Sequence, residues 1–80
     1  AVKLYPNPTR DKIQLDFEQS LPAEGILRVF NFQGQLLYQR TVSQGVKNQV
    51  IDTQQWPAGT YLLHLHSSKG SVQRQFAVVK

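Results

Sequence analysis

The chain has 80 residues, of which 40% are hydrophobic, with a formal net charge of +4 and no cysteine. Its length predicts one small domain that buries roughly 60% of the surface of the unfolded chain, and the lack of cysteine excludes disulfides and thiolate metal sites. The nine Lys and Arg residues are scattered along the whole sequence, which favours a solvated basic surface over a nucleic-acid or membrane footprint.

Apolar and polar residues alternate at period two through most of the sequence, and Gly, Pro, Asn and Asp interrupt the pattern about every ten residues. This pattern is typical of short antiparallel strands, and no segment predicts a helix. No apolar run approaches the ~20 residues that span a bilayer. The sequence therefore predicts a small all-β sandwich. The expected strands cover residues 2–5, 12–17, 26–32, 35–42, 48–52, 60–67 and 71–79.

Two of these strands indicate where the core lies. Residues 12–17 alternate apolar with polar side chains and predict a half-buried strand. Residues 26–32 alternate less cleanly and put Phe30 on the face opposite Val29, so we expect apolar surface on both sides. The turn Asn31-Phe32-Gln33-Gly34 then predicts a hairpin in which Gly34 adopts a positive φ.

The strand at residues 60–67 has the clearest alternation. Its apolar side chains at positions 61, 63 and 65 share one face. The opposite face holds His64 and His66, whose spacing would let both side chains reach one metal ion. No neighbouring Cys or carboxylate completes such a site, so we interpret them as solvated histidines and predict no metal and no cofactor.

The segment Tyr5-Pro6-Asn7-Pro8 is stiff, because each proline fixes φ at about −65° and removes a backbone donor. We expect a rigid corner between the first two strands, in which Tyr5 packs its ring and Asn7 makes a side-chain turn.

A second turn, Trp56-Pro57-Ala58-Gly59, stands before strand 60–67. We expect Pro57 and Gly59 to form a tight turn and the Trp56 indole to cap the open end of the core. The alternative is that Trp56 stacks on a sugar. This interpretation is weaker, because a tryptophan beside a proline in a corner is usually buried.

Catalytic motifs are missing from the sequence. The chain has five carboxylates, and its serines lie in turns or at strand ends without a Gly-x-Ser-x-Gly elbow. It also lacks a Gly-rich phosphate loop. We predict that it is not an enzyme.

Four segments carry a resemblance to a known family: in order along the chain, they are residues 4–9, the hairpin at 29–37, Ile51-Asp52 with the turn at 57–63, and the basic apolar ending at 76–80. Together they resemble the C-terminal sorting domain of type IX secretion cargo in Bacteroidetes, the Por secretion system. The resemblance covers nearly the whole chain. It implies an immunoglobulin-like sandwich of seven strands that forms a single domain over residues 1–80. The chain begins with Ala and shows no signal-peptide pattern, so we expect a piece detached from an upstream cargo protein.

The resemblance also implies partners and a destination. The domain would be a secretion signal and a substrate, recognised in the periplasm by the outer-membrane type IX translocon and its shuttle and sortase proteins. It would then reach the cell surface or the extracellular medium, where the surface sortase commonly removes such domains.

The turn at residues 31–34 departs from the family's usual Asp or Asn followed by a varied pair, and Phe32 adds apolar surface there. The cleavage junction would lie upstream of or near Ala1.

From the positions of the motifs, we predict that the secretion machinery reads the turn before strand 60–67 together with the last strand. A terminal strand at a sheet edge offers unpaired backbone groups for strand addition, and the same edge could support a homodimer. We expect no nucleic-acid partner. The predicted partner-recognition residues are Pro57, Ala58, Gly59, Thr60, Tyr61, Val78, Val79 and Lys80, and the predicted structural-motif residues are Tyr5, Pro6, Asn7, Pro8 and Gly34.

Two alternatives come from other classes of protein. The first is a stand-alone carbohydrate-binding or adhesive module that uses Phe30, Phe32, Tyr38 or Trp56 as stacking platforms. Several of these rings in one solvent-facing row would favour it, whereas burial of the rings would remove its platform. The second is a structural spacer, whose deletion would leave localisation unchanged.

Overall fold

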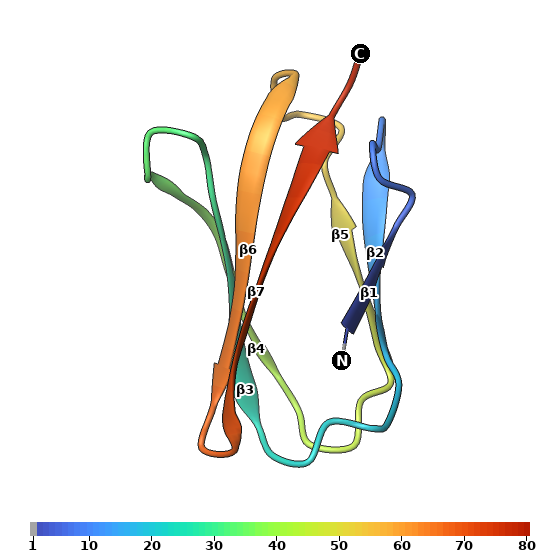
Figure 1. The fold of residues 1–80 in the computed structure, drawn as a ribbon, viewed down its shortest axis with the longest axis vertical. Coiled ribbons are helices and arrows are strands. Elements are labelled where there is room, and N and C mark those ends of the chain that lie inside the picture. Colours follow the sequence, from blue (N-terminus) through green and yellow to red (C-terminus); the bar gives the residue numbers. More distant parts are fainter. Residues whose placement is uncertain (1) are drawn as a thin grey trace.

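The computed structural model describes residues 2–80 and contains seven strands in two antiparallel sheets that face each other (Figure 1). Ala1, near which the cleavage junction is expected, lies outside the described residues. Residues 2–80 contain no helix that is long and apolar enough to cross a bilayer. The strands are β1 (Val2–Tyr5), β2 (Lys12–Phe17), β3 (Gly25–Phe30), β4 (Leu36–Val42), β5 (Asn48–Asp52), β6 (Gly59–Ser67) and β7 (Gly70–Val78).

The order of the strands confirms the predicted immunoglobulin-like sandwich. One sheet has the order β1-β2-β5 and the other the order β4-β3-β6-β7. As in immunoglobulin domains, the first, second and fifth strands face the third, sixth and seventh strands. The fourth strand pairs with the third strand and not with the fifth. At the other side of this sheet β7 pairs with β6 alone, so β7 is an edge strand, as predicted.

The core lies between the sheets and follows the predicted alternation. In β6 the side chains at positions 61, 63 and 65 are buried, while those at 62, 64 and 66 are half-buried or exposed. β3 has apolar side chains on both faces, because Val29 is buried and Phe30 is half-buried on the outer face. The buried apolar residues are Ile13, Leu15, Phe17, Leu21, Leu27, Val29, Val42, Ile51, Tyr61, Leu63, Leu65, Phe76 and Val78.

The largest difference from the predicted strands concerns β3, which ends at Phe30 and not at residue 32. The Oδ1 atom of Asn31 accepts hydrogen bonds from the backbone N–H groups of Gln33 (3.0 Å) and Gln35 (2.9 Å). The chain therefore starts to reverse before residue 32. Gly34 completes the turn with a φ of 87°, as predicted.

The proline corner differs from its predicted form. Tyr5 does not pack into the core: its side chain is 44% exposed, and its hydroxyl accepts a hydrogen bond from Nε2 of Gln14. The side-chain oxygen of Asn7 accepts a hydrogen bond from the distant backbone N–H of Ala77 (3.1 Å) where we expected a local turn. The peptide bonds before Pro6 and Pro8 are both cis. The corner is thus tied to the end of the chain.

We expect Gly34→Ala to lower the free energy of unfolding by about 1 kcal/mol, because a side chain disfavours the left-handed backbone conformation. A Cβ atom at this position would meet no heavy atom within 4 Å, so urea unfolding of this variant reports backbone strain alone. Gly34→Asn should cost less, because Asn tolerates this conformation better than Ala does. Equal losses for the two variants would contradict this account.

Candidate functional site

Three sequence motifs meet at one end of the sandwich, at the top of Figure 1. Pairing of β6 with β7 sets Gly59 opposite Val78 and Thr60 opposite Ala77. The proline corner reaches the same place, because Thr9, which directly follows it, forms a parallel bridge with Val78. The turn before β6, the end of β7 and the proline corner therefore lie side by side.

Backbone hydrogen bonds join the proline corner to the last strand. The N–H of Thr9 donates to the carbonyl of Ala77, and the carbonyl of Thr9 accepts from the N–H of Val79, both at 2.8 Å. The side chain of Asn7 accepts from the N–H of Ala77. Because the corner connects β1 with β2 while β7 belongs to the opposite sheet, these bonds link the two sheets directly. We call the contacts of Asn7, Thr9 and Lys80 with their partners the terminal clasp.

Lys80 contributes the charged part of the clasp. Its Nζ atom donates to the backbone carbonyls of Gln54 (3.0 Å), Arg10 (3.3 Å) and Thr53 (3.3 Å). An ammonium group has three donors, so all three are used within the domain. The acceptors come from the β1–β2 and β5–β6 connections. Lys80 thus ties the end of β7 to two loops.

Tyr61 anchors the turn before β6. Its side chain is buried, and its hydroxyl donates to the carbonyl of Pro57 at 2.5 Å. Burial raises the pKa of the Tyr61 phenol. A tyrosine near the start of the sixth strand that bonds back to the preceding backbone is the tyrosine corner of immunoglobulin-like sandwiches. This contact gives the Tyr61 and Pro57 positions a structural role.

An aromatic cluster fills this end of the core beneath the turn. The Trp56 ring lies 5.2 Å from the ring of Tyr61 and 6.5 Å from those of Phe76 and Tyr38, measured between centroids. Trp56 and Tyr38 are half-buried and pack against the core. The capping role predicted for Trp56 is therefore confirmed, and two of the four rings considered as sugar platforms belong to the core cluster.

The predicted recognition residues divide into two groups. Tyr61 and Val78 are buried, so a partner cannot reach their side chains in the folded domain. Residues 57–60 and Val79 are exposed and lie next to one another, because Gly59 and Thr60 pair with the end of β7. Lys80 is also exposed, but its ammonium group belongs to the clasp. Val79 is 36% exposed although its N–H is held by Thr9. Residues 57–60 and Val79 form an exposed strip beside the clasp.

The free edge of β7 is shorter than the sequence predicts. Outward-pointing backbone groups occur at every second residue of an antiparallel edge strand, and the clasp occupies those of Ala77 and Val79. The next outward positions are Gln75 and Gln73. The carbonyl of Gln73 accepts a hydrogen bond from Nη1 of Arg74. A partner strand would find its free backbone groups in the middle of β7.

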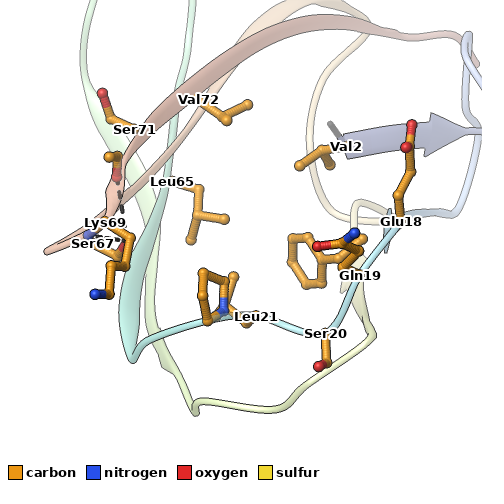
Figure 2. A pocket seen from close by; sticks show the side chains of 13 residues that line it. Val2, Glu18, Gln19, Ser20, Leu21, Leu65, Ser67, Lys69, Ser71 and Val72 are labelled. Atoms are coloured by element: carbon orange, nitrogen blue, oxygen red, sulfur yellow. Dashed lines mark hydrogen bonds between the residues drawn. The ribbon is translucent and has the colours of Figure 1, made fainter.

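The opposite end of the sandwich has no clasp. Here the edge strands β1 and β7 diverge around a hollow of about 460 Å³, which Figure 2 shows between Val2 and the pair Leu65 and Val72. Leu21 lies at its base. In the part of the chain that the structure describes, no group of three or more His, Cys, Asp or Glu side chains could hold a metal ion. The hollow lies at the end of the core opposite the Trp56 cluster.

Sequence analysis assigned no structural role to Thr9 or Thr53. Both are buried at the clasp end, and the N–H of Thr53 donates to the carbonyl of Asp11. The hydroxyl of Thr9 bonds to the carbonyl of Lys12, whereas that of Thr53 has no partner. No signal in the sequence separates them from ordinary turn residues, because their contacts are to backbone atoms.

Comparison with known families gives a match over nearly the whole chain. The family described as secretion system C-terminal sorting domain matches residues 3–80. The comparison with curated proteins found no match. The matched residues include the whole clasp, both turn motifs and every strand except the first residue of β1.

We expect Lys80→Met to lower the free energy of unfolding by about 1 to 2 kcal/mol, because it keeps an apolar stem and removes a charged donor from three carbonyls. The matched control is Lys69→Met in the exposed β6–β7 turn, which should change stability by less than about 0.5 kcal/mol. Urea unfolding measures both. A Lys80→Met variant as stable as the control would show that the ammonium contributes nothing to the clasp.

We expect Tyr61→Phe to cost about 1 kcal/mol at neutral pH, because the Pro57 carbonyl loses its donor. The raised pKa of Tyr61 adds a pH dependence with a definite sign. The neutral phenol is favoured in the folded state, so its contribution is complete below the ordinary value of 10.0 and is lost as the pH rises through the raised folded pKa. The advantage of the wild type over Tyr61→Phe should therefore shrink above pH 10.0. A difference that stays constant across that range would contradict this.

Proposed function

This chain belongs to the family of secretion system C-terminal sorting domains, and from that membership we propose how its export role is carried out. A member of this family is a C-terminal type IX sorting signal, which acts as part of a cargo protein bound for the cell surface or the extracellular space. In our proposal the folded domain passes through the periplasm, is read by the outer-membrane translocon and its shuttle proteins, and is removed from the cargo by the surface sortase.

The observation that carries this proposal is the meeting of the sequence motifs at one end of the fold. The turn at 57–61 and residues 78–80 are next to each other because β6 pairs with β7. We propose that the partner contacts the exposed strip of residues 57–60 and Val79. The buried residues Tyr61 and Val78 would support that strip from within.

Strand addition would take place along the middle of β7. The edge position of β7 and its outward-pointing residues Gln73 and Gln75 support this mode. A homodimer through the same edge is less well supported. It would bring together two copies of the sheet that contains Arg28 and Arg74 and no carboxylate, so like charges would oppose it.

The carbohydrate-binding alternative has lost part of its support. Tyr38 and Trp56 pack against the core, which leaves Phe30 and Phe32 on the outer face. Phe32 is 82% exposed, so a ligand on this face would find an aromatic ring there. The family match spans nearly the whole chain and supports the sorting role.

We expect Val79→Glu to reduce export of a reporter fused in front of this chain in a type IX-competent host, because a charge would enter the exposed strip while the backbone of the clasp remains. Protease accessibility of the reporter on intact cells measures surface delivery. The matched control is Val50→Glu, which alters a 47% exposed valine on the other sheet. It should export normally, and urea unfolding of both variants checks that the domains are folded.

Four further results bear on the proposal. Deleting residues 78–80 should also block export, but it removes the clasp and so does not separate recognition from folding. If Val79→Glu and substitutions at Ala58 and Thr60 all export at the wild-type level, the exposed strip is not the recognition surface. If a reporter without the domain still reaches the surface, the domain is a spacer. A surface reporter that keeps the mass of the whole fusion would argue against sortase removal.

A further inference from the structure

The net charge of the chain is carried by one of its two sheets. The four-stranded sheet and its two hairpin turns, residues 25–42 and 59–78, contain no Asp or Glu. The rest of the chain holds all five carboxylates and five Lys and Arg residues, whose formal charges cancel. The four-stranded half therefore carries the whole formal charge of +4. Its cations are Arg28, Arg40, Lys69 and Arg74.

The contacts of these cations leave their charge uncompensated. Nε of Arg28, on the outer face of β3, donates to the side-chain oxygen of Gln39 at 2.9 Å. Nη1 of Arg74 donates to the backbone carbonyl of Gln73 at 2.8 Å. Both acceptors are neutral. Among the cations on strands, the register places Arg28 on the outer face, whereas Arg40 and Arg74 stand opposite the buried residues Leu27 and Leu63 on the two edge strands. The four-stranded half as a whole still has a positive potential that an anionic partner would relieve.

An apolar cluster lies on the same face, one row of side chains away from Arg28. The sheet register sets Phe30 opposite Leu36 on β4 and opposite Leu62 on β6. Leu36 is exposed, and Phe32 at the tip of the β3–β4 hairpin is 82% exposed. Apolar side chains that gather at the surface in this way often mark an interaction site.

A groove opens within this cluster. It has a volume of about 430 Å³ and is lined by Phe30, Phe32 and Leu62, with Thr60 and Gln75 among its polar lining residues. It contains no charged side chain. Such a groove suits one apolar side chain, with hydrogen-bonding groups nearby that can orient the segment carrying it.

We propose that the outer face of the four-stranded sheet binds an acidic segment of a partner protein that inserts one aromatic or branched aliphatic side chain into this groove. A carboxylate of the segment would face Arg28, and the other cations of this half would attract the segment at longer range. The inserted side chain would displace water from Phe30, Phe32 and Leu62. This binding goes beyond the export role. Its test uses the 80-residue chain alone, so failure of either proposal leaves the other standing.

The observations favour a protein segment over the other anionic partners. A sugar unit could stack its C–H face on Phe30 or Phe32, but it would bring no projecting apolar group to fill the groove. A lipid surface would bind a protruding apolar tip, but it would leave the groove beneath Phe32 unfilled. Only a chain that carries both carboxylates and a single projecting side chain matches the charge and the hollow together.

The test is an NMR titration of the ¹⁵N-labelled chain with a short synthetic peptide in which Glu alternates with Ser around one central Trp. We expect saturable shifts at Arg28, Phe30, Leu62 and Gln75 that weaken as salt is added. Phe32→Ser and Arg28→Glu should each weaken binding about tenfold. Tyr5→Ser and Lys47→Glu, which make matching changes outside the four-stranded sheet, should leave it unchanged.

Several outcomes would overturn the proposal. It fails if the peptide produces no saturable shifts, or if the shifts map to the three-stranded sheet. It also fails if a peptide with Ser in place of the central Trp binds equally well, because the groove then plays no part. Stronger binding to alginate, or to vesicles of phosphatidylglycerol and phosphatidylethanolamine, would assign the face to an anionic polysaccharide or to a lipid surface.

Discussion

The backbone contact between Thr9 and the end of β7 is the constraint on which the rest of this structure depends. A cysteine-free sandwich of this size has a small core, so contacts between the sheets outside that core contribute to its stability. The bonds from Thr9 to Ala77 and Val79 join the two sheets directly. At the other end, backbone hydrogen bonds of Leu21 with Gly45 and Val46 join the β2–β3 and β4–β5 connections, and the edge strands β1 and β7 lie on either side of the hollow between Val2 and Val72 (Figure 2). The clasp therefore closes one end of the sandwich by joining β7 to the proline corner.

The motifs that resemble an export address are the same residues that close this end. Asn7 and Lys80 hold the clasp, and Tyr61 fixes the turn that lies beside it. The two parts of the exposed strip, residues 57–60 and Val79, are adjacent because β6 pairs with β7, so an unfolded chain would separate the surface that we propose for recognition. A partner that reads this strip would also be testing whether the domain has folded. In such a signal, stability and recognition cannot be varied independently at most positions.

Much of the fold follows from the sequence, and much of the site does not. The bounds of β2 and β5, the buried face of β6 and the positive φ of Gly34 were all predicted, because period-two alternation and glycine are local signals. The contacts of Asn7 and Lys80 were not, because their partners are backbone groups that every residue offers. We also expected Tyr5 to pack its ring, but its side chain is exposed. This prediction was wrong because alternation does not show which strands lie at the edge of a sheet or what covers them.

The four-stranded sheet combines a free edge with the whole net charge, and the two features constrain each other. An unpaired edge strand invites association with other copies of the chain. Two copies that met along β7 would bring together cations such as Arg28 and Arg74 without any carboxylate between them, so self-association is opposed over the distance at which charges act in salt solution. An acidic partner experiences the opposite force and is drawn towards the same face. The uneven distribution of charge thus discourages pairing between copies while leaving the edge and the groove beside Phe30 open to a partner of complementary charge.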